Sequence, residues 1–228
     1  MPRNKRQSPP PLPARYEEWI SYLFDQPVVS RTGDLHAAEF DASDGEITAL
    51  FTATMRRCGD DLLPFSLSQV AQGLDLLFNP ALSNHAFSLK AESVPKSARV
   101  EALQSIRTLY TDCFERRCEP VLSHRNEPGG NRLNMVCYML WDVSPLNYWK
   151  DDPDAALYYD TVVDLLDAVL ALGNVACLES ALHGLGHTAA YARPGQVAAV
   201  IDRFLRLRKG LRPELAHYAR CASTGYVN

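Results

Sequence analysis

The stretch 176–227 constrains the fold of this chain more than any other, because apolar residues recur there at helical spacing in three consecutive blocks. Apolar positions three and four residues apart define one face of a helix, whereas a half-buried strand alternates with a period of two. Pro194 and Pro213 each stand at the start of a new block, where the fixed φ of proline suits the first helical turn. The spacing therefore predicts three packed helices joined by very short turns.

The part of the chain that precedes residue 176 also has the pattern of an all-α protein. The same periodicity predicts further helices over 16–24, 46–58, 67–78, 95–118, 133–141 and 154–172. Ser66 and Gln69 are spaced as a capping box, Asp44 is placed to cap the 46–58 helix, and Gly59 is placed to end it. Since no segment alternates with a period of two, we expect about eight to ten helices in an irregular array, with little or no sheet.

Small and apolar residues pattern the last quarter of the chain: Ser180-Ala181-Leu182, Gly184-Leu185-Gly186, Pro194, then Val197, Val200, Ile201, Phe204 and Leu205. This pattern, over about 153–228, resembles HEAT-type or armadillo-like helical repeats. The whole chain resembles bacterial proteins that contain such repeats. The resemblance implies helix pairs stacked toward the C-terminus and a role in binding other proteins.

A proline-rich segment precedes the predicted helices. Residues 1–14 hold five prolines and several basic residues without an acid, which predicts a disordered basic tail. We expect residues 15–228 to form a single all-α domain. The composition of the chain, 46% hydrophobic and 22% charged, is typical of globular proteins. The Pro128-Gly129-Gly130 loop marks the best sub-domain boundary, near 125–132.

Charge and hydropathy narrow the partners and the location. The first 15 residues carry four basic groups and no acid, which leaves 19 basic against 27 acidic residues, a formal charge of −8, in the remainder. An acidic body disfavours nucleic-acid binding, which needs clustered Lys and Arg. No apolar run approaches the roughly 20 residues of a membrane span, and no signal-peptide pattern opens the chain. We expect a cytoplasmic protein whose six scattered cysteines are mostly buried, reduced thiols.

One helix carries a candidate metal site. Glu179, His183 and His187 lie four residues apart, so they share one side of the helix. Two histidines at this spacing can share a zinc ion, and a carboxylate can add a third ligand. Gly184 stands where zinc metalloproteases of the H-E-x-x-H type need a glutamate base, so no catalytic residue is assigned. The alternative is that the histidines hydrogen-bond across a helix contact, which the neighbouring glycines favour.

Two surface features point to a protein partner. A basic ridge comprises Arg203, Arg206, Lys209 and Arg212. The first three of these residues fall opposite an apolar stripe, so we expect them to be exposed. Tyr148 and Trp149 lie in a loop where we expect them to be exposed, and such aromatics dominate interface hot spots. The alternatives are a solvated helix face for the ridge and a packed loop anchor for the aromatics. Self-association through the exposed aromatics, as a homodimer, is a third hypothesis.

Together these features predict a non-enzymatic interaction protein. It would act as an adaptor, scaffold or inhibitor, bind its partner through one face of the helical stack, and need no cofactor. The alternative is a metal-binding protein or metal-dependent hydrolase that uses Glu179, His183 and His187. The chain has no G-x-S-x-G, P-loop or dinucleotide motif to favour another enzyme class.

Overall fold

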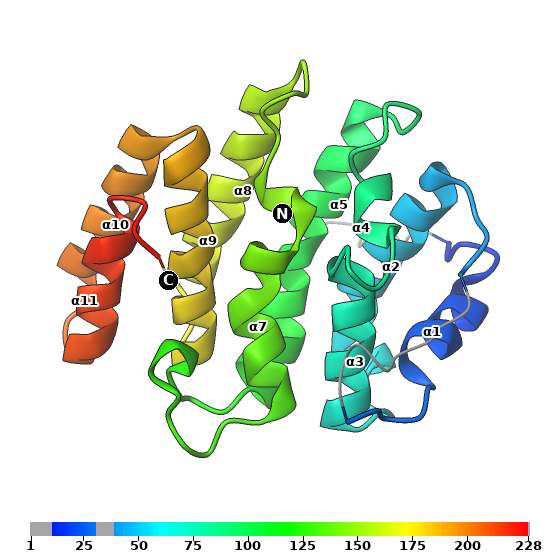
Figure 1. Ribbon diagram of the computed structural model, residues 1–228, viewed down its shortest axis with the longest axis horizontal. Helices are drawn as coiled ribbons and strands as arrows, with labels where there is room; N and C mark the ends of the chain where they lie inside the picture. The colour runs from blue at the N-terminus through cyan, green and yellow to red at the C-terminus, as the bar shows by residue number, and fades with distance from the viewer. Residues whose placement is uncertain (1–10, 31–38, 228) are drawn as a thin grey trace, which may run out of the picture.

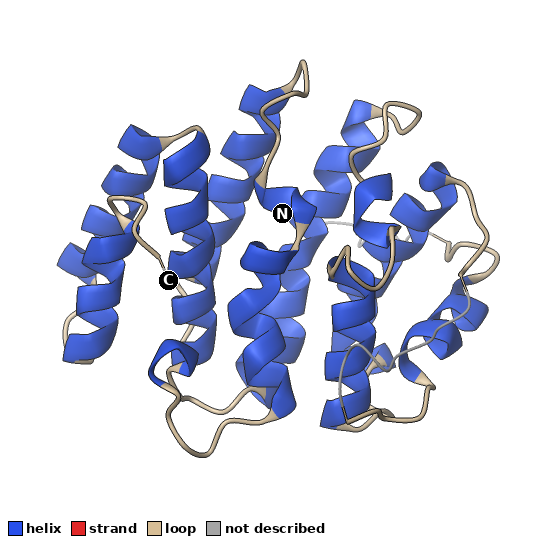
Figure 2. Cartoon of the chain, in the orientation of Figure 1, coloured by secondary structure: helices blue, strands red, loops and turns tan. Residues whose placement is uncertain are grey.

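The structure is a computed structural model that describes residues 11–30 and 39–227. Every regular element in these ranges is a helix (Figure 2), which confirms the all-α fold. Most of the expected tail, residues 1–10, lies outside the described residues. None of the helices in the described ranges is long and apolar enough to cross a membrane. Five of the six cysteines are buried, as predicted, and Cys221 is half-buried.

The long helices stand side by side, from α1 at one end of the molecule to α11 at the other (Figure 1). One row consists of α2 (Asp44–Asp61), α5 (Lys96–Thr108), α8 (Ala155–Val169) and α10 (Pro194–Leu207). The other row consists of α1 (Tyr16–Phe24), α3 (Leu67–Phe78), α7 (Arg132–Val143), α9 (Val175–Tyr191) and α11 (Pro213–Ala222). From α2 onward these helices alternate between the rows along the chain. Their lengths run from 9 to 18 residues, so the array is irregular.

Several helix boundaries follow the predicted signals. The helix over 16–24 is confirmed as α1, and Pro194 and Pro213 are the first residues of α10 and α11. The capping box is also confirmed, since the Gln69 N–H donates to Ser66 Oγ at 3.3 Å. The predicted cap of α2 is wrong by one residue: Ser43, rather than Asp44, accepts from the Glu46 N–H through its hydroxyl, at 3.3 Å.

Gly59 does not end α2, which continues to Asp61. A Cβ atom on Gly59 would lie 2.8 Å from the Asp112 Cβ, so this glycine allows a close helix contact instead of a helix stop. Asp112 lies in η2 (Leu109–Phe114), a π-helical stretch that continues α5 into the short α6 (Glu115–Arg117). The predicted 95–118 helix is therefore one run with a wider turn inside it. Between the predicted 67–78 and 95–118 helices, the structure adds one short helix, α4 (His85–Ser88).

Helix α9 lies at the centre of the C-terminal half and packs against α7, α8, α10 and α11. Every residue from 176 to 186 is buried. The row of Glu179, His183 and His187 therefore faces neighbouring helices, with Glu179 0% and His183 3% exposed. A Cβ atom on Gly184 would lie 2.7 Å from Trp141 Cγ, which confirms the close backbone approach expected from the glycines.

Candidate functional site

Two histidines of α9 meet an aspartate from the last turn of α7. His187 Nε2 lies 3.1 Å from His183 Nε2 and 3.2 Å from Asp142 Oδ1. The three possible ligand atoms all lie within 4.8 Å of one another. The packing of α7 on α9 creates this arrangement, because the bare backbone at Gly184 lets Trp141 lie against α9 and Asp142 follows Trp141 directly. We refer to Asp142, His183 and His187 as the Asp-His-His cluster.

The cluster is buried at one end and open at the other. His183 is buried, His187 is half-buried, and the Asp142 side chain is 43% exposed. Burial, helped by the nearby His187 and His124, lowers the pKa of His183 to about 3. Burial also lowers the pKa of His187, although the Asp142 carboxylate opposes that shift. Both imidazoles are therefore neutral near pH 7, and each neutral ring offers one nitrogen lone pair.

Tyr218 of α11 orients the buried histidine. Its hydroxyl lies 2.5 Å from His183 Nδ1. Burial raises the pKa of Tyr218, so the phenol stays protonated. When His183 Nδ1–H donates to the Tyr218 oxygen, the lone pair of Nε2 faces His187 and Asp142. The Tyr138 ring, 4.7 Å from the His183 ring, packs against the same imidazole.

Glu179 does not belong to this cluster. Its Oε2 accepts from the Ser123 N–H at 2.8 Å, and its Oε1 accepts from the His124 N–H at 3.1 Å. Oε1 also bonds to His124 Nδ1. Glu179 thus holds the short helix η3 (Ser123–Arg125) against α9, and Asp142 is the carboxylate beside the histidines instead. The sequence gives no signal for Asp142, because it is 41 residues from His183 and only the helix packing brings them together.

The basic ridge is partly neutralised within the fold. Arg203 pairs with Asp167 of α8, and Arg212 donates to Glu127 at 3.0 Å. The Arg212 bond, with a backbone N–H from Leu122, lowers the pKa of Glu127 to about 2. The other two predicted ridge residues, Arg206 and Lys209, are exposed. Neither has an ion-pair partner within the described ranges.

The expectation that Trp149 is exposed is wrong. Its side chain is 1% exposed, its ring stacks on Tyr158 at 4.3 Å, and its Nε1–H donates to the Leu146 carbonyl at 2.6 Å. The Lys90 ammonium lies 5.0 Å from the ring. Trp149 thus anchors its loop to the domain. Tyr148 is half-buried, with its ring edge against Tyr191 at 5.2 Å.

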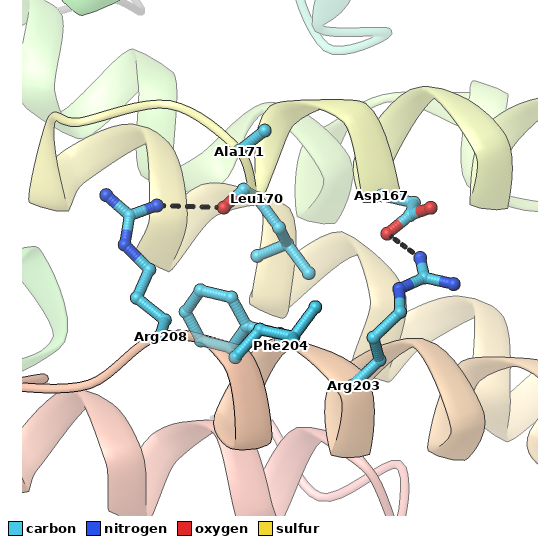
Figure 3. A pocket seen from close by; sticks show the side chains of 7 residues that line it. Asp167, Leu170, Ala171, Arg203, Phe204 and Arg208 are labelled. Atoms are coloured by element: carbon cyan, nitrogen blue, oxygen red, sulfur yellow. Dashed lines mark hydrogen bonds and ion pairs between the residues drawn. The ribbon is translucent and has the colours of Figure 1, made fainter.

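A groove of about 370 Å³ runs between α8 and α10. Its lining comprises Asp167, Leu170, Ala171, Arg203, Phe204, Leu207 and Arg208. Figure 3 shows Leu170 and Phe204 between two bridges, in which Arg203 pairs with Asp167 and Arg208 donates to the Leu170 carbonyl, at 2.9 Å. Leu207 is 71% exposed. Leu207 follows Phe204 by three residues, so it continues the helical spacing of the apolar stripe. That spacing is the one sequence signal that could place Leu207 beside the groove.

Comparisons of the chain with protein-family models, with curated proteins and with solved structures find no match.

Proposed function

We propose that this chain is a protein-interaction module that binds an acidic amphipathic helix of its partner in the groove between α8 and α10. The observation that carries the proposal is the 71% exposure of the Leu207 side chain. Leu207 borders an open groove whose apolar residues, Leu170 and Phe204, lie between the bridges made by Arg203 and Arg208. A single exposed leucine is ordinary. An exposed leucine beside a groove between two helices offers an anchor point for a helix that carries apolar residues at i, i+3 and i+4.

Charge supports an acidic partner. Residues 203–212 contain five Lys or Arg and no acid. Since the formal net charge of the whole chain is −4, the residues outside 203–212 have a formal charge of −9. Such an uneven distribution attracts an acidic segment to the ridge and repels it elsewhere, which favours one docking orientation. Arg206 and Lys209 are the exposed cations most available for that contact, because Arg203 and Arg212 are already paired with Asp167 and Glu127.

Apolar burial would supply most of the affinity and the cations would supply selectivity. Leucine and phenylalanine side chains contribute about 1.5–3 kcal/mol each when fully buried. Rim charges mainly change the association rate and its salt dependence. The proposal therefore predicts that Leu207 and the two free cations affect binding in different ways.

The experiment isolates partners from the native host by cross-linking to the full chain and then measures the affinity of the captured segment. Leu207→Asp is expected to weaken binding by about tenfold or more. The double variant Arg206→Glu with Lys209→Glu is expected to weaken binding mainly at low salt. Leu63→Asp is the matched control, because Leu63 is 65% exposed but does not line the groove.

The proposal is contradicted if Leu207→Asp and Leu63→Asp bind the captured segment equally well, or if that segment is basic or extended. Light scattering provides a separate check. A wild-type dimer that Leu207→Asp converts to a monomer would show that a second copy of this chain occupies the groove.

A further inference from the structure

We infer that the Asp-His-His cluster is a binding site for one divalent transition-metal ion, with zinc as the best-suited metal. This inference is independent of the proposed partner groove, because none of its three residues lines that groove. The ligands would be His183 Nε2, His187 Nε2 and one carboxylate oxygen of Asp142.

The donor set matches zinc. Imidazole nitrogens and a carboxylate oxygen are common zinc ligands, at about 2.0–2.2 Å from the ion. In a tetrahedron with such bonds, neighbouring ligand atoms lie about 3.3 Å apart. The measured separations are 3.1 Å between the two Nε2 atoms and 3.2 Å between His187 Nε2 and Asp142 Oδ1. The ligand atoms of the third pair, His183 and Asp142, lie within 4.8 Å of each other. Side-chain rotations that bring this pair closer would place all three atoms on one ion.

In the tautomer that carries its proton on His183 Nδ1, hydrogen bonding alone satisfies this cluster poorly. If His183 gives its Nδ1 proton to Tyr218, its Nε2 has only a lone pair to offer. His187 Nε2–H would then be shared between His183 Nε2 and Asp142 Oδ1. Three electron-rich atoms would converge around a single proton. A divalent cation at the same point would accept all three lone pairs at once.

The residues around the cluster already orient its ligands as the neighbours of a bound metal do. Metal-binding histidines usually donate their other ring N–H to a fixed acceptor, which orients the ring. Tyr218 stands at that position for His183, and its own ring is held by stacking on His124, with 4.5 Å between the ring centres. The tight contact between Trp141 and Gly184 fixes α7 relative to α9. These contacts hold two of the three ligands in place before any ion arrives.

The proposed coordination is open on one side. Three protein ligands leave a fourth tetrahedral position for water or a small ligand, as in zinc sites that exchange ligands, whereas purely structural zinc sites are closed by four protein ligands. The opening lies toward Asp142, whose side chain is 43% exposed.

A second pair of residues could bind added metal and must be separated from the cluster. His217 and Cys221 lie four residues apart on α11, and His217 Nε2 is 3.7 Å from Cys221 Sγ. His217 is exposed and Cys221 is half-buried. Because a thiolate is a soft ligand that also binds zinc, a simple zinc titration would not distinguish the two sites.

The test titrates Co²⁺ into the metal-free full chain and records the visible and near-ultraviolet spectrum. We expect one Co²⁺ per chain, tetrahedral visible bands without a thiolate charge-transfer band, and displacement by Zn²⁺. Asp142→Asn and His187→Asn are each expected to weaken Co²⁺ binding by about tenfold or more, since each removes a direct ligand. Circular dichroism checks that each variant is folded, and both altered side chains are at least partly exposed.

The matched control is the double variant His217→Ala with Cys221→Ser, which should leave the Co²⁺ affinity and spectrum unchanged. The inference is overturned if the wild-type chain binds no stoichiometric Co²⁺, if the spectrum contains the thiolate band, or if binding is lost in this control. The wild-type spectrum reports the ligand type by itself, so the inference stays testable even where a variant fails to fold.

Discussion

Replacing Gly184 with alanine tests whether the contact between α7 and α9 is as tight as its geometry implies. A Cβ atom at this position would lie 2.7 Å from Trp141 Cγ and 2.9 Å from Leu166 Cδ1, whereas ordinary contacts begin near 3.4 Å. Trp141 cannot easily move away, because it is 0% exposed and its Nε1–H donates to the Tyr110 hydroxyl at 2.8 Å. The added methyl group must therefore push α9 away from α7.

The magnitude follows from two opposing effects. Forcing a methyl group into a packed core costs about 1–3 kcal/mol, and a position blocked on two sides belongs at the upper end of that range. Alanine in place of glycine returns about 1 kcal/mol through its higher helix propensity. We expect Gly184→Ala to lower the free energy of unfolding by about 2 kcal/mol, which corresponds to a fall in Tm of about 4–8 °C for a chain of this size.

Thermal and urea unfolding of Gly184→Ala are compared with those of Gly45→Ala. Gly45 lies in the first turn of α2, with nothing within 4 Å of its added Cβ, so that substitution should be neutral or stabilise the protein by a few tenths of a kcal/mol. Gly184→Ala should also weaken Co²⁺ binding, because Asp142 follows Trp141 on the displaced helix. An unfolding free energy equal to that of the control would refute the argument from close packing.

Three further outcomes are expected. Tyr218→Phe should keep the fold but weaken Co²⁺ binding by about 10–100-fold, because it removes the hydrogen-bond partner that orients the His183 ring; an unchanged affinity would show that the phenol does not orient His183. Trp149→Ala should lower the free energy of unfolding by about 3–5 kcal/mol in urea, and a loss near zero would contradict its role as a buried anchor. Burial lowers the pKa of His85 to about 4, below the 6.5 of the unfolded chain, so the folded state binds fewer protons between these values. The contribution of neutral His85 to the free energy of unfolding is therefore complete above pH 6.5 and is lost as the pH falls toward 4. Urea unfolding at a series of pH values should show that His85→Phe reduces this loss by about 1–3 kcal/mol. Equal pH dependence in the wild type and the variant would contradict the role of buried, neutral His85.

The C-terminal helices could be placed from sequence because their signals are local. Pro194 and Pro213 act through their own backbone geometry, and the Ser66 and Gln69 capping box closes within four residues. The sequence cannot reveal the role of Gly59, because a glycine near a helix end and a glycine under a neighbouring helix look the same in sequence. The contact that distinguishes them, with Asp112, comes from a segment more than 50 residues away.

Only the part of the candidate metal site that lies on one helix can be predicted from the sequence. His183 and His187 lie on one helix, so their spacing alone indicated a pair. Helical spacing indicates Glu179 as the carboxylate, whereas the packing of α7 on α9 places Asp142 beside the histidines. The burial of Trp149 cannot be predicted from its loop position, because only the fold shows that the Tyr158 ring, from α8, covers it.

The burial of every residue from 176 to 186 in α9 has a consequence for how this protein can evolve. A surface helix has an outer face on which substitutions accumulate with little effect, but residues 176–186 have no such face. Changes there would survive only with compensating changes in α7, α8, α10 or α11, which all touch α9. The sequence of α9 should therefore diverge more slowly than that of α1, which borders fewer helices. A search for distant homologues would gain most from a pattern centred on α9.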